Sequence, residues 1–148
     1  MRTIPSVLVV LAMTAMTAPA FADEQVAGSY DVKFEESGST CNPPPVALGR
    51  GKLTIDVKNG ALTVNTELIP LMKGTPQKNG KISAKTPKVV GTTVQGLSAN
   101  YSVAGRVDGG MLQLVMTAEY IRQDNNKPYC TQAWNVSGLR AEADKTKK

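Results

Sequence analysis

Residues 53–66 read LTIDVKNGALTVNT and decide the fold, because they predict a tight antiparallel hairpin. The dipeptide Asn59-Gly60 tolerates the positive φ angles that a two-residue type I′ turn requires. With this turn at the centre, one face of both strands is apolar and the other is polar, whereas a one-residue slip would mix the two faces. The expected pairs are Val57 with Leu62, Ile55 with Val64, Leu53 with Thr66, Asp56 with Thr63 and Thr54 with Asn65.

A second hairpin is predicted around Asp108-Gly109, with Val107 facing Gly110. Its strands run for about ten residues, which is longer than the usual five or six and suits a barrel or a deep sandwich. The expected inward pairs are Gly105 with Leu112, Val103 with Leu114, Tyr101 with Met116, Ala99 with Ala118 and Leu97 with Tyr120.

The same alternation recurs near both ends of the chain, and a third turn signal, Asn79-Gly80, lies in the middle. Residues 81–86 and 89–94 are candidate short strands on either side of a Pro-containing break. The chain therefore predicts an all-β antiparallel meander of seven or eight strands. Eight such strands close into an up-and-down barrel without exposed edges, and a two-sheet sandwich is the alternative. The alternating inward residues are Tyr30, Val32 and Phe34 in the first strand and Cys130, Trp134 and Val136 in the last.

Residues 1–22 have the three parts of a cleavable signal peptide: Arg2, an apolar stretch over 4–16 and the small-x-small site Ala20-Phe21-Ala22. The apolar stretch is shorter than the roughly 20 residues that a membrane-spanning helix needs. We therefore expect a single β domain over 23–140 that does not span a membrane and is periplasmic or secreted. The charged segment 141–148 is expected to be a disordered basic tail.

Two cysteines, Cys41 and Cys130, are expected to form a disulfide, because an even cysteine count in an exported chain favours a bridge. The chain has no histidine. This removes the commonest general base and the commonest metal ligand. We therefore expect a non-enzymatic protein without a cofactor or a metal site.

Positive charge is concentrated in the middle of the chain. Between Glu67 and Asp108 there is no acidic residue, whereas Arg106 and five lysines lie there. This predicts a basic face for an anionic partner, such as an envelope surface. The alternative is that the lysines protect short strands from edge-to-edge pairing. Nucleic acid is not expected, because no aromatic residues interleave with the lysines. The five lysines are Lys73, Lys78, Lys81, Lys85 and Lys88.

The inward row of the predicted barrel contains several large side chains that could line a pocket for a small apolar ligand. Met72 ends the apolar run 68–72, which is a candidate lid over such a pocket. The alternative is an ordinary packed core. The candidate ligand contacts are Tyr30, Tyr101, Met116, Tyr120, Trp134 and Met72.

The segment 26–30, VAGSY, resembles the start of calycin barrels, the group that contains lipocalins and avidin-like proteins. A Gly-x-Trp motif commonly occupies this place there, and Gly28-Ser29-Tyr30 has Tyr in place of Trp. The resemblance implies a barrel that binds a small ligand in an internal cavity. The chain is also similar to small exported bacterial proteins, a likeness that implies no chemistry.

Three functions follow from these observations. The first is an exported barrel that holds a small apolar ligand or a partner. The second is an envelope interaction or structural protein that uses the basic face. The third is a hydrolase of unfamiliar type, which would need a cleft of converging acidic, lysine or serine side chains.

Overall fold

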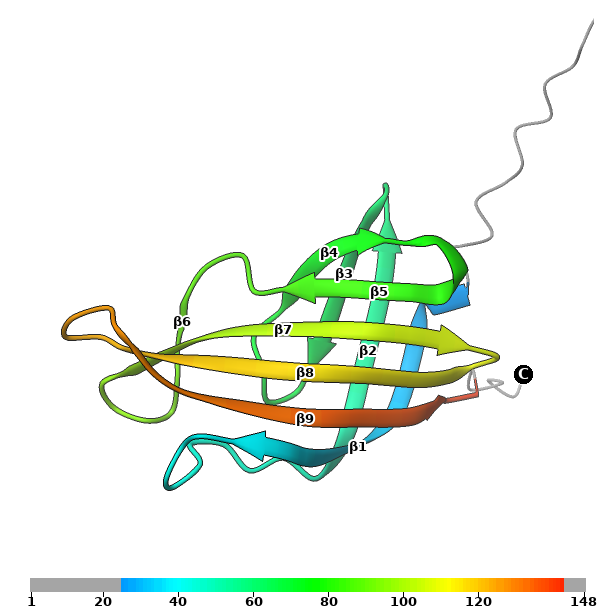
Figure 1. Cartoon of the computed structure of the whole chain (residues 1–148). Coiled ribbons are helices and arrows are strands. Elements are labelled where there is room, and N and C mark those ends of the chain that lie inside the picture. Colours follow the sequence, from blue (N-terminus) through cyan, green and yellow to red (C-terminus); the bar gives the residue numbers. More distant parts are fainter. Residues whose placement is uncertain (1–24, 143–148) are drawn as a thin grey trace, which may run out of the picture.

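The computed structural model describes residues 25–142 (Figure 1). The predicted signal peptide, 1–22, and most of the predicted tail, 141–148, lie outside the described residues. No helix within 25–142 is long and apolar enough to cross a membrane. The described elements are β1 Gly28–Ser39, β2 Arg50–Lys58, β3 Ala61–Thr66, β4 Met72–Pro76, the 3-10 turn η1 Lys78–Gly80, β5 Lys81–Lys85, β6 Val90–Gly91, β7 Leu97–Asp108, β8 Met111–Arg122 and β9 Pro128–Arg140.

The strands form one antiparallel sheet that closes on itself. Each strand from β1 to β5 pairs with its neighbour in the chain, β7, β8 and β9 do the same, and β9 pairs with β1. Pairing of β5 with β7 completes a ring of eight strands, and the short β6 pairs with β7 beside the ring. Figure 1 shows β7, β8 and β9 lying across β2 and β3, as opposite walls do in a barrel with tilted strands. The predicted antiparallel barrel is confirmed.

The β2–β3 hairpin has the predicted register throughout. Asn59 and Gly60 have φ angles of 53° and 74°, as a type I′ turn requires. The apolar face lies inside the barrel, where Leu53 and Val64 have no exposed surface. The polar face, which includes Asp56, lies outside. The turn and the hydrophobic pattern agree here, so only one register satisfies both.

The predicted register of the β7–β8 hairpin is wrong by two residues. The turn residues are Gly109 and Gly110, with φ angles of 55° and 79°, and Asp108 pairs with Met111. Two glycines enter the left-handed region without the steric cost that Asp108 would incur there, so the turn moves one residue along the chain. A two-residue shift keeps every side chain on the same face. The inward residues are therefore as predicted, but Val103 faces Met116, Tyr101 faces Ala118 and Ala99 faces Tyr120.

The middle of the chain contains a strand that the sequence pattern did not indicate. Residues 72–76 form β4, although Gly74 and Pro76 weaken its pattern. The turn signal at Asn79-Gly80 is confirmed, since η1 joins β4 to β5 and both residues have positive φ. In addition, β1 continues to Ser39 through an irregularity between Glu36 and Gly38.

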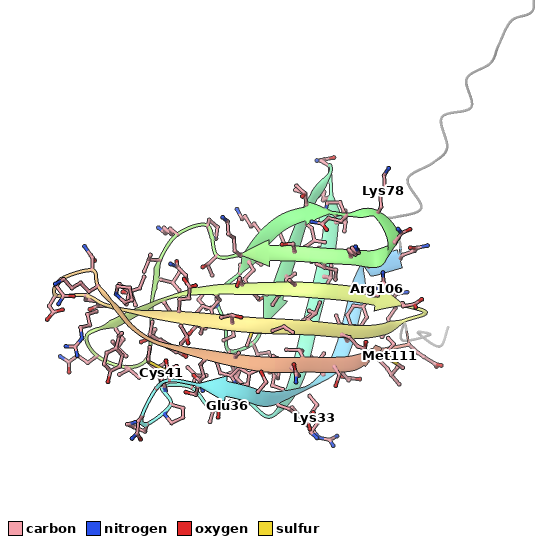
Figure 2. The ribbon with its side chains drawn as sticks, in the orientation of Figure 1. Lys33, Glu36, Cys41, Lys78, Arg106 and Met111 are labelled. Carbon is pink, nitrogen blue, oxygen red and sulfur yellow. A yellow bond between two sulfur atoms is a disulfide. The ribbon has the colours of Figure 1, made fainter. Side chains whose placement is uncertain are left out.

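The barrel has two different ends. We call the first the disulfide end; its loops are 40–49, 67–71, 86–96 and 123–127. The second, the terminal end, has the tight turns at 59–60, 77–80 and 109–110 and the first and last described residues. The predicted disulfide is confirmed: Cys41 and Cys130 are bonded across 89 residues and join the β1–β2 loop to β9. Figure 2 shows Cys41 and Arg106 at opposite ends.

We expect the disulfide to contribute strongly to stability. Bridging cysteines 89 residues apart restricts the unfolded chain by roughly 4–5 kcal/mol on the chain-entropy model. The Cys41→Ser/Cys130→Ser double variant should therefore lose about 2–5 kcal/mol in urea unfolding. Wild-type protein in reductant is the matched control and should show a similar loss. An unchanged unfolding free energy in both samples would contradict this role.

We also expect a single added methyl group at Gly105 to destabilise the barrel. A Cβ at this position would lie 2.1 Å from the Gln113 carbonyl oxygen, which is backbone and cannot move cheaply. Gly105→Ala should therefore cost about 1–3 kcal/mol or more in urea unfolding, as overpacked sites do. Gly91→Ala is the control, because nothing lies within 4 Å of a Cβ there. Equal effects of the two substitutions would show that close packing at Gly105 is unimportant.

Candidate functional site

The six candidate ligand contacts all lie inside the barrel. None is more than 4% exposed, and all belong to one hydrophobic cluster that receives side chains from every strand of the ring. These six side chains are therefore almost completely shielded from solvent. Their inward orientation agrees with the sequence pattern, and a role in holding a ligand stays a prediction. The residues are Tyr30, Met72, Tyr101, Met116, Tyr120 and Trp134.

A chain of hydrogen-bonded polar groups leads from the buried Tyr120 through the buried Gln132 to the exposed Glu36, toward the disulfide end. The Tyr120 hydroxyl donates to Oε1 of Gln132 at 2.8 Å. The Gln132 amide nitrogen donates to the Glu36 carboxylate at 2.6 Å and to the Val46 carbonyl at 2.7 Å. Sequence reasoning missed this chain. The signal was present in the alternation, because Gln132 is in line with Trp134 and Glu36 is in line with Tyr30, although Glu36 lies where β1 becomes irregular and its side chain is exposed.

Burial raises the pKa of the Tyr120 hydroxyl well above its usual range, and the nearby Tyr101 hydroxyl and Glu36 carboxylate raise it further. Burial also raises the pKa of Tyr101, although the Tyr120 hydroxyl partly offsets this effect. Both hydroxyls are therefore uncharged over the range in which most proteins work. The Tyr120 hydroxyl and the Gln132 amide thus have their hydrogen-bonding needs met inside the protein, as buried polar groups usually do.

Arg140 closes the interior at the terminal end. Its guanidinium lies over the Tyr30 ring, 5.5 Å from the ring centre, and donates to the Tyr30 hydroxyl at 3.0 Å and to the Gln25 carbonyl. The side chain passes over Gly28, where an added Cβ would lie 3.0 Å from Arg140 Nε. Arg140 is not among the predicted site residues, although it follows the inward alternation of Trp134 and Val136.

The predicted basic residues meet on the outside of β4, β5 and β7. Lys73 on β4 faces Lys85 on β5, and Lys81 on β5 faces Arg106 on β7. Lys78 lies in the turn before β5 and Lys88 follows β5, and all six side chains are exposed. Figure 2 shows Lys78 and Arg106 near the same end of the barrel. We call these six residues the basic face.

Like charges directly opposite each other destabilise a sheet by a few tenths of a kcal/mol or more per pair. Lys73–Lys85 and Lys81–Arg106 are two such pairs, and neither forms an ion pair with a carboxylate of the described residues. Within residues 25–142 the one ion pair joins Lys33 to Glu35, on β1. The basic face thus concentrates positive charge on one side of the barrel.

A hollow of about 460 Å³ opens at the disulfide end of the basic face. It forms because the β5–β7 ladder stops at Lys85 opposite Ser102, and the chain returns to β7 only at Val90. Thr86 fills the base of the gap, since its backbone N–H donates to the Tyr101 carbonyl at 2.9 Å and its hydroxyl accepts from the Tyr101 N–H at 3.2 Å. The polar groups around the hollow are those of Lys85, Lys88, Asn100, Ser102 and Glu119.

We expect the buried tyrosines to make the fold sensitive to alkali. Their folded-state pKa values lie above the ordinary value of 10.0, so the unfolded chain loses these protons first. The tyrosine contribution is thus complete below pH 10 and falls as the pH rises, by up to about 1.4 kcal/mol per pH unit for each group. Urea unfolding between pH 8 and pH 11.5 should show this slope, and Tyr101→Phe should make it shallower. The same slope in both proteins would contradict the assignment.

Comparisons with protein-family models, with curated proteins and with solved structures find no match to this chain. The resemblance to calycin barrels therefore stays a prediction from Gly28, Tyr30 and the meander. Function has to be argued from the side chains that the fold brings together. The basic face and the hollow beside it are the arrangement with the clearest chemistry.

Proposed function

We propose that this protein is an exported, non-enzymatic binding protein that holds an anionic surface of the cell envelope on its basic face. The observation that carries the proposal is the pair of like-charged contacts, Lys73 opposite Lys85 and Lys81 opposite Arg106. Like charges placed opposite each other oppose folding, and a bound anionic partner would offset this repulsion because it attracts both members of each pair.

The alternative explanation, protection of strand edges, has little to act on here. Lysines protect a strand whose outer edge is free to pair with another chain. In this barrel β4 pairs with β3 and β5, and β5 pairs with β4 and β7, so both strands lie inside the sheet, and Lys73 and Lys85 have a paired residue on each side. Protection of strand edges therefore does not explain why lysines gather on β4 and β5, whereas binding of an anionic partner does.

The spacing of the charges suits an extended partner. Residues directly opposite in an antiparallel pair have Cβ atoms about 5 Å apart, whereas Lys81 and Lys85 lie four residues apart, or roughly 13 Å along β5. The charges thus follow the wall of the barrel. A field of this kind raises the local concentration of a polyanion and speeds its association.

Binding on the outside agrees with the closed interior. A ligand inside the barrel would need space beside Met116 and Trp134, whose exposed fractions are 0% and 1%. The core would have to open to admit it, whereas the basic face is accessible without any rearrangement.

Export is part of the proposal. The Cys41–Cys130 bridge is typical of oxidising compartments such as the periplasm or the extracellular space. Residues 1–22, with their signal-peptide pattern, supply the route.

The test uses inorganic polyphosphate, a polyanion that offers charge alone. A variant in which Lys73, Lys81, Lys85 and Arg106 are each replaced by Gln should bind it at least about tenfold more weakly at low salt in calorimetric titration. Wild-type affinity should fall as salt rises, because screening weakens exposed charges. The variant should also be somewhat more resistant to urea, because two repulsive pairs are removed.

The matched control replaces four exposed basic residues of β1 and β2 by Gln and so changes the net charge equally. If the proposal is right, this control keeps most of the affinity. Equal losses in both variants would mean that only net charge matters, and the proposal would fail. The control positions are Lys33, Arg50, Lys52 and Lys58.

A further inference from the structure

The hollow at the end of the basic face differs from the rest of that face. Along β4 and β5 the charged residues are separated by small outward residues, such as Thr75 opposite Ser83. At the hollow, the loop over 86–89 leaves the wall and creates a concave site bounded by β7 and β8. Its volume of about 460 Å³ lies within the range of about 300–1,000 Å³ that is typical of small-molecule sites.

The polar groups of the hollow have two kinds of chemistry. Lys85 and Lys88 supply ammonium groups, which attract an anionic group. Asn100 and Glu119 face each other across the β7–β8 ladder, and Ser102 lies two residues along from Asn100. Amide, carboxylate and hydroxyl groups placed side by side can accept hydrogen bonds from, and donate them to, neighbouring hydroxyl groups of a ligand.

Glu119 determines which anions fit. A carboxylate repels a ligand that is acidic at every position, but it accepts a strong hydrogen bond from a hydroxyl group. The Thr86 hydroxyl and backbone N–H already form hydrogen bonds with the Tyr101 backbone, so we expect the ligand to bind through the other polar groups of the hollow. The side chains of Pro87 and Val89 border the same hollow and offer apolar contact.

We infer that the hollow binds a sugar unit that carries an acidic group, with its carboxylate or phosphate at Lys85 and Lys88 and its hydroxyl groups at Asn100, Ser102 and Glu119. This rests on the proposed function and names its partner, because the anionic surface would then be an acidic glycan. The rest of the basic face would follow further units of the chain by charge alone.

The test depends on Glu119→Gln, which keeps the shape of the side chain and adds one unit of positive charge to the molecule. If charge alone governs binding, this variant binds every polyanion slightly more tightly. If Glu119 accepts a sugar hydroxyl group, the variant should bind galacturonate oligomers at least about fivefold more weakly and polyphosphate no more weakly than the wild type. Calorimetric titration of both probes measures these opposite changes.

Asp56→Asn is the matched control, because it makes the same change of charge at an exposed site on β2, outside the hollow. It should bind both probes as tightly as the wild type or slightly more tightly. Asn100→Ala, which leaves the charge unaltered, should weaken galacturonate binding and spare polyphosphate binding. Glucose 6-phosphate, titrated in the same way, distinguishes a phosphate from a carboxylate as the acidic group.

The inference is supported if either acidic sugar binds with a dependence on Glu119 and Asn100. It is overturned if neither sugar binds, or if Glu119→Gln tightens binding of both kinds of probe. If the sugar inference fails in either way but the wild type still binds polyphosphate through the basic face, the proposed function stands. If the basic-face variant and the β1–β2 control variant lose polyphosphate affinity equally, the proposed function itself is contradicted.

Discussion

Pairing of β5 with β7 is the contact on which the rest of the structure depends. The ladder joins residues 81–85 to residues 102–106, two strands that the short β6 separates in the chain. Without it, β5 and β7 would each present unpaired N–H and C=O groups to solvent. Closure also brings Ile82 and Ala84 onto the core, where both are at most 4% exposed. The closed interior therefore depends on a short seam of five residue pairs.

The same seam carries the charge that distinguishes one side of the barrel. Lys81 faces Arg106 within it, and Lys85 borders the hollow where it ends. A hydrophobic interior and a basic exterior thus meet along one strand. Inward residues of β5 stabilise the seam, while outward residues oppose it. This conflict between stability and surface chemistry is typical of functional sites, and it makes the outside of β5 the most informative part of the molecule.

The sequence predicts this fold where turn chemistry and hydrophobic pattern agree. The register of the β2–β3 hairpin is correct because Asn59-Gly60 allows one turn only. In β7–β8, by contrast, Asp108-Gly109-Gly110 offers two overlapping turns that keep the same residues inward, so the pattern could not choose between them. The barrel was predicted to close, but the direct pairing of β5 with β7 could not be predicted from local sequence, because a loop and the short β6 separate these strands. The hydrogen bond between the buried Gln132 and the exposed Glu36 was detectable in principle, since both polar residues continue the alternation of an inward apolar row.

The candidate site was predictable in part for the same reason. A run of sequence without acidic residues identified the lysines, but only the ladders reveal that Lys73 faces Lys85 and that Lys81 faces Arg106. The hollow could not be anticipated, because it arises where two strands part. Asn100 and Glu119 gain their significance only from being opposite each other at that point.

The position of the chain ends has a practical consequence. Gln25 and Arg140 are in contact, so the chain enters and leaves the barrel on one rim, while the hollow opens toward the other. An affinity tag that replaces the chain before Gln25 or after Arg140 would start from the rim opposite to the hollow. The protein could therefore be tethered through either end in a binding experiment without obstructing the side of the barrel where β5 leaves β7.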